Sequence, residues 1–355
     1  NLEATFDKCD PKTGEVIAKY KNFSLDEVFA QVNLAQDASI RWQEFGFTAR
    51  KRTLLKWASY ITKHQSEIAA LVATECGKPL SDAALEVSIA IDHIAWAAKH
   101  AEEIMQKQNR PAGLLMFNMK AQVQRSPLGV VGVIGPWNYP IFTPMGSIAY
   151  ALAAGNTVVI KPAPQTPSST IKLIELAKQI FAPGTIEVIL GDAEVAQQLV
   201  KDTRISMVSI TGSSDSGRKV MQAASETTKR VHLELGGKAP VIVREDADLS
   251  QVAQAISMAC TYNSGQDCTA ATRIYAHHSV VKDLEKLMKQ KMDLIKVGDP
   301  KDKSSDIGPL ISEKHRYLVH QKVQKAINDG ATLITGGKVI DGIGFYYTPI
   351  KSFNW

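Results

Sequence analysis

The stretch GVVGVIG, residues 129–135, is a run of valine and isoleucine set between glycines. Similar runs rich in β-branched residues follow it along the chain, at 157–163, 186–191, 206–212 and 231–243. Segments with apolar residues at helical spacing separate these runs, for example residues 168–181. Nearly continuous apolar strands that alternate with helices are typical of a parallel sheet covered on both faces. The series therefore predicts a doubly wound, Rossmann-like α/β domain, a fold that commonly holds a dinucleotide.

Both flanks of this series continue the α/β pattern. Upstream, helices are expected at 25–45, 49–75 and 81–106. Residues 114–127 are expected to be extended, as part of a bridging or oligomerisation hairpin. Downstream, a strand is expected at 272–278 and a helix at 280–295. Because 355 residues exceed one ordinary domain, we expect a cofactor domain over 1–235 and a second α/β domain over 236–355.

The composition excludes several classes of function. Hydrophobic residues make up 45% of the chain and charged residues 22%, as in a globular protein with a substantial core. The net charge of +5 is scattered, without the basic clusters and interleaved aromatics that nucleic acid requires. No apolar run has the length of a membrane span, and no signal peptide is visible. The four cysteines are far apart or in unlike settings, which predicts reduced thiols in the cytoplasm, and no metal-binding motif is present.

The glycine-rich segments taken singly leave alternatives open. Gly129, Gly132 and Gly135 form GxxGxxG, which is not the dinucleotide fingerprint GxGxxG, and tight packing explains it about as well. In ITGSSDSG, residues 210–217, a strand ends at small residues and a helix is expected from about Ser216. The backbone N–H groups at that helix start suit a phosphate. An ordinary serine N-cap is the equal alternative.

Five motifs taken together are far more specific. They are PWNYP (136–140), VIKPAPQTP (159–167), ITGSSDSG (210–217), LELGGKAP (233–240) and YNSGQDCTA (262–270). With these motifs in this order, the chain resembles the aldehyde dehydrogenase superfamily over essentially its whole length. Around the last two motifs it is most similar to γ-aminobutyraldehyde dehydrogenases, with the succinate-semialdehyde branch as the nearest competitor. The resemblance implies oxidation of an aldehyde to a carboxylic acid with NAD or NADP.

The resemblance assigns the nucleophile to Cys268. A thiolate adds to an aldehyde to give a thiohemiacetal, which loses hydride to leave a thioester for hydrolysis. Cysteine suits both steps because its thiolate is strongly nucleophilic and later leaves well. Cys260 is expected on the preceding helix, as a core residue.

Two further catalytic roles follow from matching motifs. Glu234 matches the general base, and its place between leucines at a strand end is expected to raise its pKa by partial burial. Asn138 matches the amide that stabilises the oxyanion together with the N–H of Cys268. A helix N-cap is the alternative interpretation of Asn138.

The cofactor residues are likewise carried over from the resemblance. Lys161 matches the ribose lysine, Gly212 and Ser213 lie in the segment that matches a pyrophosphate contact, and Pro136 and Trp137 pass near the nicotinamide in relatives. Many NAD-preferring members have a glutamate three residues after the lysine. Here that residue is Pro164, so the repulsion against a 2′-phosphate is absent and NADP is expected to be tolerated.

The substrate tunnel is expected to be lined by Tyr139, Thr143 and Asp267. Relatives often have a bulky side chain where this chain has Gly146, so the tunnel is expected to be wide. A carboxylate next to the nucleophile in a partly desolvated tunnel favours a cationic tail, which points to ω-aminoaldehydes rather than succinate semialdehyde. The alternative is that Asp267 bonds a backbone N–H of its own loop.

The chain is shorter than the family. Relatives continue well past Trp355, and the part absent here carries a nicotinamide-ribose motif and a strand that pairs with a neighbouring subunit. The second domain is therefore expected to be incomplete. Three functions remain open: an NAD(P)-dependent dehydrogenase acting on a small-molecule aldehyde, an esterase using Cys268 alone, or an inactive assembly module. A full-length relative is expected to form a homodimer or homotetramer.

Overall fold

The computed structural model describes residues 4–353, and its centre is a five-stranded parallel sheet. The strand order is β7-β6-β5-β8-β9. The strands are β5 (Val130–Ile134), β6 (Thr157–Lys161), β7 (Ile186–Val188), β8 (Ile205–Gly212) and β9 (Arg230–Leu235). Every pairing is parallel, and the five predicted strand regions supply all five strands. The predicted doubly wound α/β class is confirmed.

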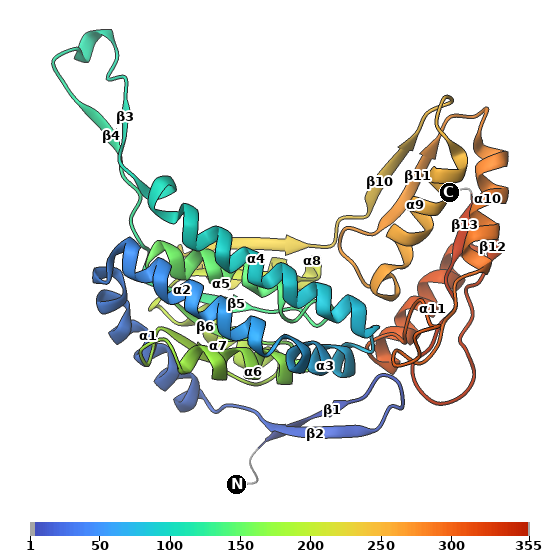
Figure 1. The fold of residues 1–355 in the computed structure, drawn as a ribbon, viewed down its shortest axis with the longest axis horizontal. Coiled ribbons are helices and arrows are strands. Elements are labelled where there is room, and N and C mark those ends of the chain that lie inside the picture. Colours follow the sequence, from blue (N-terminus) through green and yellow to red (C-terminus); the bar gives the residue numbers. More distant parts are fainter. Residues whose placement is uncertain (1–3, 354–355) are drawn as a thin grey trace.

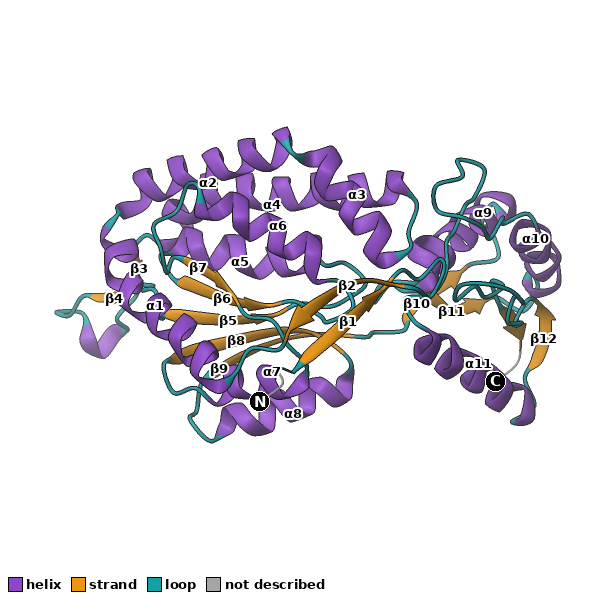
Figure 2. Ribbon diagram, turned by 90° about the horizontal axis from the view of Figure 1, so that it is seen from below, coloured by secondary structure: helices purple, strands orange, loops and turns teal. Residues whose placement is uncertain are grey.

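Helices cover both faces of this sheet (Figure 2). One face carries α5 (Phe142–Ala154) and α6 (Pro167–Lys178), with α2 (Gly46–Lys63), α3 (Gln65–Cys76) and α4 (Leu80–Met105) packed outside them. The opposite face carries α1 (Leu25–Glu44), α7 (Ala193–Lys201) and α8 (Ser214–Ser225). All five residues of β5 and of β6 are buried, because they lie between two helical layers.

The strand order reverses at β5, and this places the site. The connection after β5 leads to β6 on one side, whereas β8 pairs with β5 on the other. Ligands of open α/β sheets bind outside the carboxyl ends of the strands at such a switch point. The motif segments that follow β5, β6, β8 and β9 all lie at this edge.

Two upstream expectations need correction. The predicted helix over 49–75 is two helices, α2 and α3, because the backbone of His64 (φ −105°, ψ 13°) is not helical. The hairpin expected over 114–127 starts earlier, with β3 (Gln108–Arg110) pairing with β4 (Ala121–Val123). Its tip contains a single 3₁₀ turn (Leu114–Met116) rather than extended chain. The hairpin projects away from the body of the molecule (Figure 1).

A second group of elements follows β9. The strands β10 (Ala239–Val243) and β11 (Ala271–Ala276) form a separate parallel pair, and α9 (Leu249–Thr261) and α10 (Val281–Asp293) pack on it. Farther along lie α11 (Glu313–Asn328) and an antiparallel pair, β12 (Thr332–Thr335) with β13 (Lys351–Phe353). An N-terminal hairpin, β1 (Thr5–Cys9) and β2 (Val16–Lys21), runs along the first group and reaches this second one through a Lys12–Asp299 ion pair of 2.8 Å. Over residues 4–353 no helix is long and apolar enough to cross a membrane.

Candidate active site

Cys268 lies in the loop between α9 and β11, and the backbone before it is unusual. After α9 the chain makes a left-handed turn in which Asn263, Ser264 and Gly265 all have φ between 52° and 72°. Such a conformation is costly for residues with a Cβ and persists only where surrounding contacts impose it. Here the Ser264 hydroxyl donates to the Gly308 carbonyl (2.9 Å), and the Gln266 side chain accepts from the Ile311 N–H (2.9 Å). The loop is therefore held from the C-terminal side by residues 308–311.

Asn138 reaches this loop from the other side of the site. Its side-chain amide donates to the Gln266 carbonyl at 2.9 Å, two residues before the cysteine. The Asn263 amide completes the contact by donating to the carbonyls of Asn138 (3.1 Å) and Gln266 (3.2 Å). An amide nitrogen carries two N–H bonds, so Asn138 keeps a second donor for an oxyanion. Asn138 is not a helix N-cap, because α5 begins only at Phe142.

A buried ion pair holds the backbone around Asn138, and sequence reasoning did not find it. The Lys78 ammonium contacts Glu86 at 2.9 Å, and both side chains are almost fully buried. The same ammonium donates to the Asn138 carbonyl (2.7 Å) and lies 4.4 Å from the ring centroid of Tyr139. Glu86 in turn accepts from the N–H groups of Ile141 and Phe142, at 2.9 and 3.2 Å. The available signal was a lysine and a glutamate eight residues apart, at the start of an otherwise apolar helix face.

Glu234 is placed differently from expectation. It lies at the end of β9, as predicted, but its side chain is 58% exposed rather than partly buried. The reason is that β9 is an edge strand whose side chains alternate between half-buried and exposed. Its carboxylate Oε1 lies 3.3 Å from the Nε2 of His232, two residues earlier on the same strand face.

Among the four cysteines, all within the described residues, Cys268 alone is exposed. Cys76 is buried, and burial raises the pKa of its thiol to about 12. Cys260 is half-exposed rather than a core residue, with its sulfur donating to the Ser257 carbonyl at 3.4 Å. Partial burial, followed by the nearby charges of Asp267 and Glu234, raises the pKa of Cys268 as well. Cys268 is thus the accessible thiol, in a setting that disfavours its thiolate in the free chain.

The predicted cofactor residues occupy the carboxyl edge of the sheet. Lys161 ends β6 and is 3% exposed, and its ammonium donates to the Pro162 carbonyl at 3.0 Å. Burial lowers the pKa of Lys161 to about 8. Two hydroxyls on the adjoining segment, those of Thr166 and Ser169, are buried without a hydrogen-bond partner. A buried ammonium fits a polyhydroxyl ligand such as a ribose, and the unpaired hydroxyls follow on the next segment of the chain.

The second part of the cofactor edge is the start of α8. Gly212 ends β8, and Ser213 is the N-cap of α8, accepting from the Ser216 N–H at 3.2 Å. The serine is therefore a cap, and the helix begins at Ser214, two residues earlier than expected. Capping uses one N–H, and the remaining N–H groups of the first turn still suit an anion. These residues fit a dinucleotide.

The remaining predicted cofactor residues lie on the two connecting segments. Pro164 is half-buried after β6, and Pro136 is buried after β5. Trp137 packs edge-on against the ring of His315 on α11, with centroids 4.9 Å apart. Both segments leave the carboxyl edge of the sheet, where a dinucleotide is expected.

The predicted substrate residues are brought together in part. The Tyr139 hydroxyl donates to one carboxylate oxygen of Asp267 at 3.2 Å. The other oxygen accepts from the N–H and the hydroxyl of Thr269, both at 2.9 Å. Asp267 therefore makes the expected loop bond and also faces Tyr139. Thr143 lies on the first turn of α5, and a side chain at Gly146, one turn later, would meet no atom within 4 Å.

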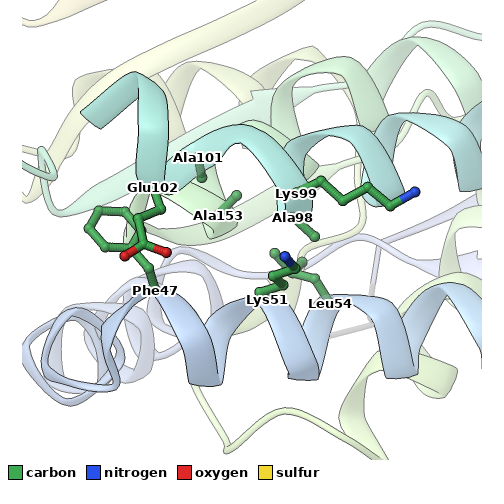
Figure 3. Close-up of a pocket in the computed structure, with 8 residues that line it drawn as sticks. All are labelled: Phe47, Lys51, Leu54, Ala98, Lys99, Ala101, Glu102 and Ala153. Atoms are coloured by element: carbon green, nitrogen blue, oxygen red, sulfur yellow. The ribbon is translucent and has the colours of Figure 1, made fainter. Parts of the chain in front are cut away.

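Figure 3 shows a small cavity elsewhere, between α2, α4 and α5. Its lining includes Phe47, Lys51 and Glu102 and contains none of the predicted site residues. It gives no alternative location for the chemistry.

A doubly wound sheet with a dinucleotide-type edge, facing an exposed thiol and an amide donor, defines the class of dinucleotide-dependent oxidoreductases. The aldehyde dehydrogenase family model matches residues 1–351. The chain belongs to the aldehyde dehydrogenase family, an enzyme family that oxidises aldehydes, as the motifs predicted.

Curated relatives cover nearly all of this chain. Lactaldehyde dehydrogenase of Escherichia coli is 34% identical over 98% of the chain and 72% of its own length. A probable succinate-semialdehyde dehydrogenase [NADP(+)] of Sinorhizobium fredii is 34% identical over 97% of the chain and 70% of its own length. Aminoaldehyde dehydrogenase 2 of Pisum sativum is 32% identical over 96% of the chain and 69% of its own length. The chain thus spans about 70% of the length of these relatives.

Solved structures agree with the fold. Lactaldehyde dehydrogenase from Escherichia coli superposes with a TM-score of 0.94, at 32% identity, over 99% of this chain and 73% of that one. The NAD⁺ complex of a Bacillus cereus aldehyde dehydrogenase gives a TM-score of 0.93, at 30% identity, over 98% of this chain and 71% of that one. The expectation of NAD or NADP as cofactor agrees with the cofactors that these relatives' names carry.

Proposed function

We propose that this chain oxidises aldehydes through a covalent thioester on Cys268. The observation that carries the proposal is the contact between Asn138 and the Gln266 carbonyl. It joins an amide donor from the sheet edge to the backbone two residues before the exposed Cys268, which supports the proposal that the two act together. Acyl-transfer chemistry requires an oxyanion donor close to the nucleophile, and Asn138 would supply it.

The chemical steps use three side chains. The Cys268 thiol loses its proton to solvent, and the thiolate sulfur bonds to the carbonyl carbon while the C=O π electrons move onto oxygen, giving an oxyanion that the second N–H of Asn138 would stabilise. The nicotinamide of NAD or NADP, when bound, supplies the acceptor for the hydride that leaves this adduct. Glu234 then removes a proton from water, whose oxygen bonds to the thioester carbon. The C–S bond breaks with its electron pair on Cys268, releasing the carboxylic acid.

The same proposal assigns the cofactor edge. Lys161 would hold ribose hydroxyls, and the first turn of α8 after Gly212 and Ser213 would hold the pyrophosphate. Pro136 and Trp137 would border the nicotinamide. Pro164 carries no charge against a 2′-phosphate, which supports use of NADP as well as NAD.

For the substrate we propose an ω-aminoaldehyde. Asp267 and the Tyr139 hydroxyl lie beside the nucleophile, and the space around Gly146 leaves room for a chain. A carboxylate there favours an ammonium tail and disfavours a second carboxylate. Succinate semialdehyde is the alternative. 4-Aminobutanal should therefore be oxidised faster than neutral aldehydes of equal length, and Asp267→Asn should remove most of that preference.

We also propose a functional division of the chain. Residues 1–235 would form the cofactor domain, with the five-stranded sheet ending at Leu235. Residues 236–355 would form the part that carries the nucleophile.

The experiment that tests the chemistry follows reduced nicotinamide by its absorbance. Cys268→Ala should abolish both aldehyde oxidation and ester hydrolysis while leaving cofactor binding intact. Glu234→Gln should give a single-turnover burst without steady-state turnover, because the thioester forms and is not hydrolysed. Cys260→Ala serves as the matched thiol control. Residual activity in Cys268→Ala above about a thousandth of wild type would reveal another nucleophile.

A further inference from the structure

The proposed base, Glu234, contacts a histidine whose other ring nitrogen is hydrogen-bonded to a serine, and the proposed chemistry does not use these residues. His232 Nε2 lies 3.3 Å from Glu234 Oε1. His232 Nδ1 lies 3.0 Å from the hydroxyl of Ser209, and that hydroxyl lies 2.7 Å from the hydroxyl of Ser147. These contacts cross three elements, from α5 through β8 to β9.

The sheet register makes this arrangement specific. Ser209 and His232 are direct partners across the β8–β9 ladder, so their side chains share one face. Glu234, two residues after His232, lies on the same face. Helix α5 packs on that side of the sheet and brings Ser147 to the buried Ser209 (Figure 2).

The direction of the hydrogen bonds follows from the carboxylate. The carboxylate of Glu234 lies 3.3 Å from Nε2, and its negative charge favours the tautomer of His232 that carries the N–H there. In neutral histidine Nδ1 is then an acceptor, and the Ser209 hydroxyl must donate to it. The Ser209 oxygen in turn accepts from the Ser147 hydroxyl. The tautomer of His232 with the proton on Nε2 is therefore compatible with the contacts of Glu234, Ser209 and Ser147 together.

We propose that His232, held by Ser209 and Ser147, is a positioning residue for the base Glu234 during hydrolysis of the thioester. The inference rests on the proposed function of Cys268 and Glu234. The imidazole holds Oε1 and leaves Oε2 free to accept the proton from water. Such help is needed because Glu234 lies on an edge strand, where more than half of its side chain is exposed and little packing restricts it.

The step that His232 assists is the decay of the acyl-enzyme, and this decay can be observed directly. The chain is mixed with NAD and propanal, a neutral aldehyde, and the mass of the acid-quenched protein is followed over time. His232→Leu should acylate Cys268 at the wild-type rate, whereas the acyl group should be lost about tenfold more slowly. A wild-type decay rate, or an equal slowing of acylation and decay, would overturn the inference.

Matched variants distinguish the effect of the His232 N–H group from the effect of its side-chain packing. Gln carries an N–H close to the position of Nε2, so His232→Gln should restore decay to within about threefold of wild type. Ser209→Ala should slow decay, and combining it with His232→Leu should add nothing, because both act through one imidazole. His278→Asn, an exposed histidine beyond β11, is the control and should change nothing. Additive effects of the Ser209 and His232 variants would contradict action through one imidazole.

A measurement without catalysis keeps the inference testable if the proposed function fails. If wild type never acquires an acyl group on Cys268, the proposed function is wrong for this chain. The ¹⁵N resonances of the His232 ring, recorded where imidazole is neutral, should still show a protonated Nε2 and an unprotonated Nδ1. Ser209→Ala and Glu234→Gln should each shift them. The opposite tautomer, or resonances that neither variant moves, would overturn the proposed arrangement of Ser147, Ser209, His232 and Glu234 itself.

Discussion

At the scale of single residues, the acid beside the nucleophile works against the thiolate. The pKa of Cys268 is raised first by partial burial and then by the charge of Asp267. Asp267→Asn removes that charge and keeps an oxygen that accepts from the Thr269 N–H. The pKa of Cys268 should fall, so at a fixed pH near neutrality a larger fraction is thiolate and iodoacetamide should label it faster.

The labelling rate measured against pH by mass spectrometry checks this expectation. Its midpoint should move to lower pH in Asp267→Asn and stay in place in the control Asp246→Asn, an exposed acid near β10. An unchanged midpoint would mean that the Asp267 carboxylate is screened from the sulfur.

Lys161 gives a second prediction at this scale. Burial lowers its pKa from 10.5 to about 8, so the folded chain disfavours the protonated form. The resulting cost is fully present below about pH 8 and is relieved as the pH rises from 8 toward 10.5. Lys161→Met should therefore stabilise the free chain at neutral pH by on the order of 1–3 kcal/mol, and by less near pH 10. The same variant should lose stabilisation by NAD.

Denaturant unfolding at two pH values, each with and without NAD, measures both effects. At each pH the unfolding free energy of wild type is subtracted from that of the variant, because other groups also titrate. An equal stability difference at neutral and alkaline pH would show that the lysine is not strained by burial.

At the scale of elements, the Lys78–Glu86 pair joins the start of α4 to the start of α5. Glu86 accepts from the first N–H groups of α5, while Lys78 holds the Asn138 carbonyl. Glu86→Gln keeps the acceptor and leaves the lysine charge buried without its partner. We expect a loss of about 3–5 kcal/mol in unfolding free energy and slower acylation of Cys268.

An apolar replacement of both residues separates stability from positioning. Lys78→Met with Glu86→Leu should regain much of the stability, because it buries no unpaired charge. It should not regain the acylation rate, since nothing then holds the Asn138 carbonyl. If the double variant recovers both the unfolding free energy and the acylation rate, the Lys78–Glu86 pair contributes only packing.

At the scale of the whole molecule, the hairpin β3–β4 has no core of its own. Leu114, Leu115 and Phe117 at its tip are 86–92% exposed. Large exposed apolar side chains gathered in one place mark an interaction surface. We expect the tip to pack against a second copy of the chain. Leu115→Ser with Phe117→Ser should shift sedimentation toward the monomer.

The control for the hairpin is Ile343→Ser, an exposed apolar residue in a distant loop. It should leave the sedimentation coefficient unchanged. A wild-type chain that is monomeric at high concentration would contradict the expectation.

Local pattern was enough for the doubly wound sheet and for the order of its strands along the chain. The reason is that buried parallel strands read as apolar runs and the helices between them carry a distinct period. The motifs likewise predicted Cys268, Asn138 and the cofactor edge as site residues, because each lies in a short segment with its own turn chemistry. The break at His64 was missed, since apolar spacing continues through both helices.

Tertiary structure alone decided how these segments meet. The sequence showed Lys78 and Glu86 eight residues apart but not that Lys78 holds the Asn138 carbonyl, because that contact joins residues 60 positions apart. The sequence also did not show that Glu234 is exposed. The exposure of a strand residue depends on the position of its strand in the sheet, and β9 is an edge strand. The link from Ser147 through Ser209 to His232 exists only because the β8–β9 register and the packing of α5 bring three separate segments to one face. Local chemistry sets which elements form, whereas contacts between distant segments set the geometry of the site.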